Sequence, residues 1–460
     1  MAALLDARAA RRRFVAVNFL FWFPVGLSIP VQVLLLVDRG VSVATVAALF
    51  AVHSLTAAAL ELPTGGLSDV IGRRAVLAAS GVLAVVAITL TALATATWVF
   101  ALAMFLKGAG RALNSGPAEA WYVDTVHADL GPDADLRDGL ARGSAASSVA
   151  LALGTILGGL VPWLLGLGPD LGARLERATG GLVTPLSVPL LAGATCCVLY
   201  VVHVLVALPE PPRPSTGLRA VLADVPRTAR AGIRLATRDV MVRRIMLTMA
   251  AAGSALGVVE LLTPSRSADA TGGASSGAVL YAGLACAGFT ATALGNRLSP
   301  WVARVARSGE RAILAAELTM LLGLAVLCAT AATDTAAPAV AGYVLVYVGL
   351  GLASPCLNDF LHRRTDSSGR ATALSVQSLA LQLAGALSGL VAGALPGGPA
   401  AWLPGVVGVS AGALLWLRAR TTPKATPAEA AAAQAGPDSE RPAGTQAPGT
   451  PARDAMETPR

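Results

Sequence analysis

Residues 65–74 have the sequence GGLSDVIGRR, a short segment with one aspartate and two arginines between two long apolar stretches. The stretches cover about 43–63 and 75–96, and each is close to the roughly 20 residues that a helix needs to cross a bilayer. Charges between two such stretches belong at a membrane face, because they are costly within the hydrocarbon. This segment therefore predicts a chain that turns at the surface of a membrane.

Composition supports the same class of protein. Hydrophobic residues make up 55% of the 460 residues, mean hydropathy is +0.65, and charged residues make up only 13%. That charged share is about half of the roughly 25% found in soluble domains, so the chain could not cover itself in water. In lipid, repeated apolar runs of this length have to be helices, because every backbone polar group must be satisfied within its own segment.

Twelve apolar runs follow one another, each long enough for one span. They cover about 14–36, 43–64, 75–96, 98–120, 141–166, 186–208, 243–263, 277–295, 312–331, 338–358, 371–394 and 399–417. The sequence therefore predicts an all-α membrane protein with twelve transmembrane helices in two six-helix bundles. The expected parts are an N-terminal segment (1–13), a first bundle (14–208), a linker (209–242), a second bundle (243–418) and a tail (419–460).

The placement of Lys and Arg predicts which way the chain faces. Of the 35 basic residues, only six lie outside the segments expected to be cytoplasmic when the N-terminus is inside: Lys107 and Arg111 within the fourth run, and Arg39, Arg174, Arg177 and Arg266 on the outer side. This asymmetry follows the positive-inside rule for an even number of spans. We therefore expect a multi-pass protein of the plasma membrane with both termini in the cytoplasm.

The linker and the tail differ from the apolar runs. The linker begins with Pro-Glu-Pro-Pro-Arg-Pro at 209–214, which cannot continue a helix. It then becomes amphipathic with a basic stripe, which predicts a helix lying on anionic lipid; an extended tether is the alternative. The tail, 419–460, is rich in Ala, Pro, Thr and Gly, so we expect it to be disordered.

Catalytic and metal chemistry is not indicated. The five cysteines all fall inside expected spans, and none of the four histidines is spaced for metal binding. We therefore expect no enzyme activity, no metal and no cofactor. The net charge of +8 follows from topology and lipid head groups, so no nucleic-acid partner is expected.

The motif that contains 65–74 points to a family. The pattern Gly65-x-Leu67-x-Asp69-x-x-Gly72-Arg73-Arg74-x-x-Leu77 resembles the signature loop between the second and third helices of the major facilitator superfamily. The preceding Glu61-Leu62-Pro63-Thr64-Gly65 is similar to the drug-efflux members. The resemblance implies that Asp69 meets the start of the eleventh helix, near 370–372, and that the arginine pairs with an acid at the end of the fourth, where Asp124 lies. These contacts would form a cytoplasmic latch between the halves; a solvated inner loop is the alternative.

The two bundles repeat each other at a shift of about 230 residues. The matching positions are Arg13 with Arg243, Gly65 with Gly295, Arg74 with Arg304 and, one residue off, Gly154-x-x-x-Gly158 with Gly385-x-x-x-Gly389. In the second copy of the signature, Ser299 replaces Asp69 and Val302 replaces Gly72. The shared offset favours internal duplication, which is common in secondary transporters.

The fourth run carries the most informative charges. Lys107 and Arg111 lie one helical turn apart near its middle, and Asn114 continues that face. Each cation costs at least about 2.5 kcal/mol at this depth, so both should face a cavity or a partner, with Glu61 and Glu119 as candidate acids. This set predicts a proton-coupling or substrate-binding network; a structural ion-pair cluster is the alternative. Where proton-coupled relatives often carry an arginine, this chain has Met104.

The fifth run contains Gly154-Thr155-Ile156-Leu157-Gly158-Gly159, similar to the antiporter motif G-P-x-x-G-G of the family except that Thr155 replaces the proline. The resemblance implies that Gly154, Gly158 and Gly159 bend or seal a gate; close helix packing through small residues is the alternative. Other polar residues within the spans could line a cavity or form helix–helix hydrogen bonds: Asn18, Gln32, His53, Glu260, Glu317, Gln377 and Gln382.

The resemblance, with these residues, predicts a monomeric secondary transporter that exports small, amphipathic molecules in exchange for protons by alternating access. Its expected partners are a small-molecule substrate, protons and the lipid bilayer. The alternatives are an importer of a small metabolite on the same fold and a membrane sensor or binding protein that no longer transports. A phosphate-binding G-x-x-x-x-G-K-[ST] sequence does not occur in the chain, which argues against direct use of ATP.

Overall fold

The computed structural model describes residues 5–65, 67–210, 234, 239–333, 335–364 and 367–417. Residues up to Arg418 belong to one compact unit, and 419–460 form a second. The expected linker helix and the expected disorder of the tail lie outside the described residues, as do the side-chain contacts of Asp69 and of residues 370–372.

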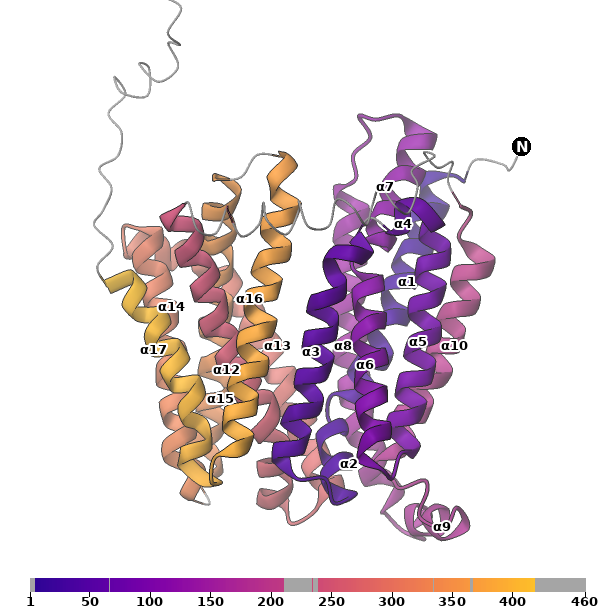
Figure 1. Ribbon diagram of the computed structural model, residues 1–460, viewed down its shortest axis with the longest axis vertical. Coiled ribbons are helices and arrows are strands. Elements are labelled where there is room, and N and C mark those ends of the chain that lie inside the picture. Colours follow the sequence, from indigo (N-terminus) through magenta and orange to yellow (C-terminus); the bar gives the residue numbers. More distant parts are fainter. Residues whose placement is uncertain are drawn as a thin grey trace, which may run out of the picture. The chain divides into compact units, whose positions relative to one another are not determined.

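The described residues are helical and contain no strand. The first half consists of α1 (Ala7–Ser28), α2 (Gln32–Asp38), α3 (Val43–Gly65), α4 (Leu67–Ile71), α5 (Arg73–Leu93), α6 (Thr97–Asn114), α7 (Pro117–Leu130), α8 (Arg137–Leu165), α9 (Leu171–Ala178) and α10 (Ser187–Ala207). The second half consists of α12 (Val240–Thr271), α13 (Ala274–Val305), α14 (Gly309–Ala329), η1 (Thr330–Ala332), α15 (Ala336–His362), α16 (Ser367–Ala394), η2 (Gly398–Trp402) and α17 (Leu403–Leu417) (Figure 1). The prediction of an all-α membrane protein in two bundles is confirmed.

Among the described residues, eleven segments are long and apolar enough to cross a membrane. The twelfth predicted span corresponds to α6, which is not among them. Lys107 and Arg111 lower the hydropathy of this 18-residue helix, yet it packs between α3 and α5 as a full member of its bundle. The layout is therefore that of twelve spans, and α6 is the span that its two cations make more polar than the others.

Two expected spans are broken. The run at 14–36 divides into α1 and α2 next to Pro30, and the run at 98–120 divides into α6 and α7 at Gly116. Gly116 has a φ of 99°, a conformation that favours glycine, and Pro117 then starts α7 at a position where its missing N–H costs nothing. The apolar runs coincide with helices, but α12 and α13 extend beyond the predicted ends at 263 and 295, and the turns inside the two broken runs were not predicted.

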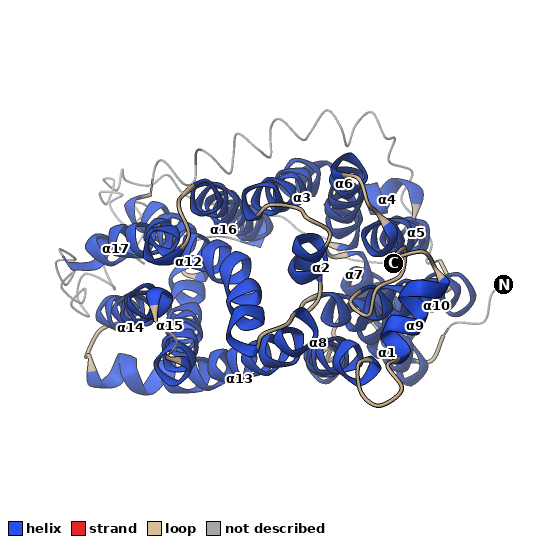
Figure 2. Ribbon diagram, turned by 90° about the horizontal axis from the view of Figure 1, so that it is seen from below, coloured by secondary structure: helices blue, strands red, loops and turns tan. Residues whose placement is uncertain are grey.

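The most extensive contacts between the halves are those of two helix pairs, α3 with α16 and α8 with α13. The repeat relates these pairs, because α3 corresponds to α13 and α8 to α16. Between the halves, α2 contacts α12 and α13, and it lies centrally in the view from below (Figure 2). One buried apolar cluster draws on both halves, including Phe100 and Met104 with Val258 and Leu261.

Close glycine contacts repeat within the two halves. A Cβ at Gly26 of α1 would lie 2.5 Å from the carbonyl oxygen of Leu151 in α8. In the second half, a Cβ at Gly257 of α12 would lie 2.2 Å from the carbonyl oxygen of Gly385 in α16. The two sites are related by the same shift of about 230 residues, so the internal duplication is visible as a shared mode of helix packing.

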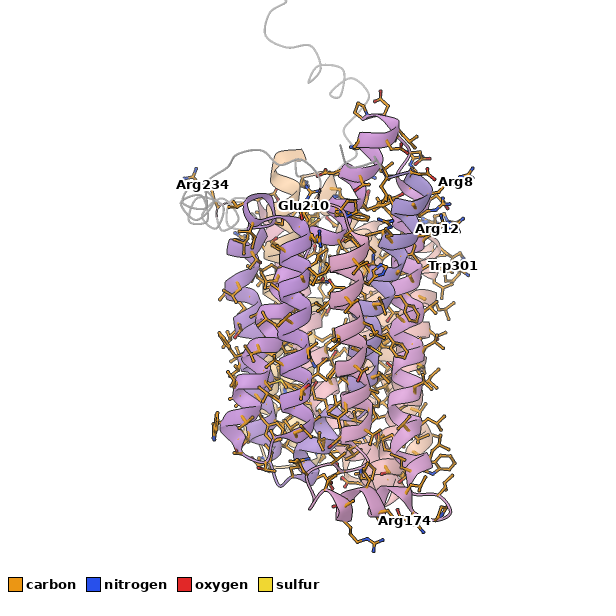
Figure 3. All side chains as sticks on the ribbon, turned by 90° about the vertical axis from the view of Figure 1, so that its right-hand side faces the viewer. Arg8, Arg12, Arg174, Glu210, Arg234 and Trp301 are labelled. Carbon is orange, nitrogen blue, oxygen red and sulfur yellow. The ribbon has the colours of Figure 1, made fainter. Side chains whose placement is uncertain are left out.

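The two ends of the helices carry different residues. Arg8, Arg12 and Glu210 lie at one end of the molecule, whereas Arg174 of α9 lies at the other (Figure 3). The first end also holds α4 and α7, and the second holds α2 (Figure 1). They are called the α4 end and the α9 end below.

Candidate functional site

A cavity of about 410 Å³ lies between the two halves. The first half contributes residues of α1, α2, α3 and α6, and the second contributes residues of α12, α13, α15 and α16. This volume is in the range of small-molecule pockets, which is about 300–1,000 Å³. Because both halves form its walls, a movement of one half against the other would change its shape.

The wall from the first half is cationic. Lys107 and Arg111 of α6 both line the cavity, together with His53 of α3. The Lys107 ammonium donates a hydrogen bond to the side-chain oxygen of Gln32 in α2. Among the described residues, no carboxylate lies within ion-pair distance (4.0 Å) of Lys107 or Arg111, and the Arg111 side chain is exposed. The two cations therefore face the cavity and not lipid.

The wall from the second half is acidic and aromatic. Glu260 of α12 lines the cavity with an exposed side chain, and it has no ion-pair partner among the described residues. Tyr281 of α13 and Tyr343 and Tyr347 of α15 line the same side. The rings of Tyr343 and Tyr347 lie 4.9 Å apart, centroid to centroid. An unpaired carboxylate next to three phenol rings thus faces the cationic wall.

Glu61 lies beside the cavity, at the boundary between the halves. Its carboxylate accepts long hydrogen bonds from Gln382 Nε2 at 3.4 Å and Ser378 Oγ at 3.5 Å, both on α16. Gln382 also donates to Ser378 at 3.0 Å, so the two α16 side chains are held together. This acid of α3 therefore connects the first half directly to the second.

Two of the predicted network residues lie elsewhere. Asn114 accepts a hydrogen bond from the Tyr200 hydroxyl at 3.0 Å, which ties α6 to α10 within the first half. Glu119 is exposed in the first turn of α7, beyond the break at Gly116. Neither residue lines the cavity. The structure therefore brings together Lys107 and Arg111, with Glu61 beside them, but not Asn114 and Glu119.

The signature segment forms the short helix α4 and a turn at Gly72, whose φ is 101°. Arg73 then forms an ion pair with Asp124 of α7 and donates to the Ala120 carbonyl oxygen. Arg74 donates to the Leu205 carbonyl oxygen at the end of α10. These contacts join the start of α5 to α7 and α10, all in the first half.

Glu210 completes the surroundings of the signature segment. Its carboxylate accepts hydrogen bonds from the backbone N–H groups of Arg73 at 2.9 Å and Arg74 at 3.1 Å. An acid at a helix start satisfies free N–H groups and complements the helix dipole. The first acid of the linker therefore caps the helix that follows the signature segment.

The glycines of α8 serve two contacts. Gly154 and Gly158 pack against the backbone of α1 at Phe23 and Leu27, within the first half. Gly159 faces the second half, where an added Cβ would lie 2.5 Å from the Ala278 carbonyl oxygen and 2.5 Å from the Ala282 Cβ. Thr155, in the place of the family proline, is fully buried. Only Gly159 of this group lies at the boundary between the halves.

Asp239 precedes α12 and lies outside the spans. Its carboxylate accepts hydrogen bonds from the N–H groups of Met241 and Val242 and from the Arg364 guanidinium. Partial burial acts to raise the pKa of Asp239, but these donors hold it below its ordinary value. The residue thus caps α12 and connects it to the end of α15.

The sequence analysis did not identify several residues of the site as functional candidates. Glu260 and Gln32 were grouped with polar residues of undecided role, and the tyrosines were not considered. The spacing of Tyr343 and Tyr347, one helical turn apart in an apolar run, was an available signal. Glu210 was passed over because it lies among prolines.

Comparisons with known proteins agree with this arrangement. Residues 14–389 match the profile described as Major Facilitator Superfamily. The search of curated proteins gave no match. Solved structures with a similar fold include the nucleoside transporter NupG, with 11% identity over 89% of this chain and 97% of that one and a TM-score of 0.65. A bacterial homolog of the human lysosomal transporter Spinster, inward-facing and unoccupied, has 15% identity over 89% and 95% and a TM-score of 0.65. The xylose transporter XylE from E. coli, partially occluded and inward open, has 15% identity over 90% and 98% and a TM-score of 0.62.

Proposed function

Because the chain belongs to the Major Facilitator Superfamily, we propose that it exports small, amphipathic molecules across the plasma membrane in exchange for protons. The observation that carries this proposal is the cavity between the halves, with Lys107 and Arg111 on one wall and Glu260 on the other. Charged groups within a membrane protein commonly mark substrate or ion pathways. The apolar remainder of the lining suits the apolar part of an amphipathic solute.

Alternating access requires that one end be closed while the other is open. At the α9 end, Gly159 contacts Ala278 and Ala282, and Gly393 of α16 lies against Ala44 and Ala47 of α3. At the α4 end, the hydrogen bonds between the halves among the described side chains are the long ones that Ser378 and Gln382 donate to Glu61. The distribution of basic residues supports assigning the α4 end to the cytoplasm. We therefore interpret this conformation as closed to the outside and accessible from the cytoplasm.

Glu61 is the acid that we propose as the proton carrier. It lies on α3 beside α16, and only the ionised carboxylate accepts from both Gln382 and Ser378 at full strength. Proton uptake would weaken this contact between the halves, whereas proton release would restore it. Protonation would thus change the relative stability of two arrangements of the bundles.

The signature segment is proposed to act as a cytoplasmic latch. Arg73, Asp124 and Glu210 hold the start of α5, which follows α4, against α7 and the start of the linker. A rigid unit of this kind at the α4 end could present Asp69 to the start of α16, as the family resemblance implies. The α8 glycines Gly154 and Gly158 are proposed to keep α8 close to α1, so that Gly159 can seal the α9 end.

Import of a small metabolite is the second candidate function. The fixed charges of the cavity favour it, because an importer should hold its solute with fixed polar groups. The structural neighbours described as nucleoside and xylose transporters carry metabolites on the same fold. A sensor that no longer transports would keep the fold while the cavity charges had no effect on flux.

One experiment separates these functions. Inside-out vesicles that contain the full chain are incubated with a panel of radiolabelled compounds in the medium, with and without a pH gradient that is acid inside. Export in exchange for protons predicts that the gradient drives compounds into these vesicles and that a protonophore abolishes accumulation. Accumulation in right-side-out vesicles alone would support import, and no flux in either orientation would support a sensor.

A further inference from the structure

Charged side chains of opposite sign face the same cavity without forming an ion pair. Lys107 and Arg111 belong to the first half and Glu260 to the second, and no ion pair joins them among the described residues. The Arg111 and Glu260 side chains are exposed, and a solute that fills the cavity would remove water from them, which is costly unless the solute pairs their charges. A solute that binds in the cavity is therefore expected to carry both an anionic and a cationic group.

We propose that the cavity binds a small zwitterion, with its anionic group against Lys107 and Arg111 and its cationic amine against Glu260. This inference rests on the proposed function, since it specifies the solute of the same cavity. It does not depend on the direction of transport or on the coupling ion.

The cationic wall is suited to a carboxylate or a similar anion. Gln32 already occupies one donor position of the Lys107 ammonium, which fixes its direction and leaves two further N–H groups. Arg111 lies one helical turn further along α6 and presents a planar fork of donors. A single small anion between these side chains would accept hydrogen bonds from both.

The opposite wall is suited to an amine. The Glu260 carboxylate can accept charge-assisted hydrogen bonds from an ammonium group. Tyr281, Tyr343 and Tyr347 line the same side, and their ring faces attract cations. A carboxylate and three phenol rings together select a positive group more strongly than an uncharged one.

Other solute classes leave part of this site unsatisfied. An uncharged solute would desolvate Lys107 and Glu260 and pair neither of them. A pure anion would satisfy α6 but would be repelled by Glu260, and a pure cation would satisfy Glu260 but would be repelled by Lys107. Only a solute that carries both charges, and that spans the cavity from one half to the other, forms ion pairs with the cations of α6 and with Glu260 at the same time.

This arrangement also connects binding to the relative position of the halves. The anion site belongs to the first half and the amine site to the second, so a bound zwitterion bridges them. Its affinity depends on how far apart the two walls are. A solute of this class would therefore favour the conformation in which the distance between the walls matches its own charge separation.

The test uses the full chain in lipid nanodiscs and measures equilibrium binding. The first probe set consists of four forms of leucine. Leucine itself is the zwitterion, leucine methyl ester carries only the positive charge, and N-acetyl-leucine carries only the negative charge. N-acetyl-leucine methyl ester is uncharged. A second set has the same four forms of the dipeptide alanyl-leucine, because the two sets differ in charge separation. In at least one set, the zwitterion should bind roughly tenfold or more tightly than each of its three analogues.

Two variants assign the charges to their walls. In Glu260→Gln, the zwitterion should bind only as tightly as its anionic analogue, and the anionic analogue should bind as tightly as before or more tightly. In Lys107→Gln, the affinity for the zwitterion should fall toward the affinity for its cationic analogue. Glu119→Gln, a matched acid outside the cavity, should change none of these affinities. The swapped pair Lys107→Glu with Glu260→Lys should bind the zwitterion better than either charge-reversed single variant.

The measurement on the unaltered chain decides the proposal even if a variant fails to fold. Equal binding of the zwitterionic and uncharged forms, a preference for a singly charged form, or no binding of either set would overturn it. Selective zwitterion binding without proton-driven flux in vesicles would overturn only the proposed function. Proton-driven export of other solutes with no zwitterion preference would overturn only this inference.

Discussion

The Glu61 carboxylate of α3 lies 3.4 Å from Gln382 Nε2 of α16, so an acid of the first half is hydrogen-bonded to an amide of the second. Ser378, one helical turn before Gln382, lies 3.5 Å from the same carboxylate oxygen. An ionisable group at the boundary of two mobile bodies can convert proton binding into movement. This relationship underlies the first prediction.

Glu61→Gln should abolish proton-driven accumulation in inside-out vesicles. Exchange of labelled for unlabelled solute at equal concentrations, which needs no proton gradient, should continue. Glutamine keeps the size and can still bond to Gln382, but it cannot bind and release a proton. Glu119→Gln is the matched control, because Glu119 is exposed on α7 away from the cavity. Normal proton-driven flux in the Glu61 variant would exclude Glu61 as the carrier.

Arg111→Ala should reduce transport strongly at normal expression, and Arg111→Lys should recover only part of it. The arginine lines the cavity, and lysine keeps the charge but not the planar arrangement of donors. Flux is measured per molecule of protein in the membrane. If the alanine variant does not accumulate in the membrane, the residue is structural, and a role in coupling or binding loses its support.

Asp69→Asn and Asp124→Asn should both lower transport while membrane insertion stays normal. The first removes a charge from the signature segment, and the second removes the partner of Arg73. We expect Asp124→Asn to have the larger effect on local protease resistance, since it breaks an ion pair within the first half. Full transport by both variants would favour the solvated-loop alternative.

Cysteines introduced at Ala428 and Ala173 should be labelled from opposite sides of the membrane, in a background without the native cysteines. Ala173 belongs to α9, at the end opposite α4 and α7. A membrane-impermeant maleimide applied to intact cells should label Ala173→Cys alone. Labelling of both positions from the same side would contradict the twelve-span topology.

Asp239→Asn should destabilise the chain at neutral pH by about 0.5–1 kcal/mol, because asparagine keeps an oxygen that can cap α12 but loses the charge that interacts with the helix dipole and with Arg364. The folded state holds the pKa of Asp239 below its ordinary value of 3.8, so the ionised carboxylate stabilises the fold above that value. This contribution is lost as the pH falls through the lowered pKa of the folded state. Thermal unfolding in detergent should therefore differ between variant and parent at pH 7, and the difference should shrink as the pH falls below about 4. A difference that does not depend on pH would argue against this role.

The sequence predicted the spans well, because lipid forces apolar runs into helices and leaves little choice. The division into halves followed from the long linker and from the repeat at a shift of about 230 residues, and the expectation that Lys107 and Arg111 face a cavity or a partner followed from the cost of charge in lipid. Glu119 was expected beside the two cations because the interpretation carried one helix through Gly116, whereas the chain turns there and Glu119 lies exposed on α7. Asn114 was assigned to the face of Arg111, but its hydrogen bond to Tyr200 depends on packing against α10. Glu260 became prominent only when the second half was placed opposite α6, which no local pattern could specify.

Gly159 sets how tightly the halves can meet at the α9 end. A single added methyl group would lie 2.5 Å from the Ala278 carbonyl oxygen, too close for the contact to persist unchanged. One carbon atom at this position would act as a wedge that disfavours the closed state and leaves the helices themselves intact. Under the proposed alternating-access mechanism, this position adjusts the balance between two access states without touching solute or proton, and Gly159→Ala should populate the opposite state for structure determination.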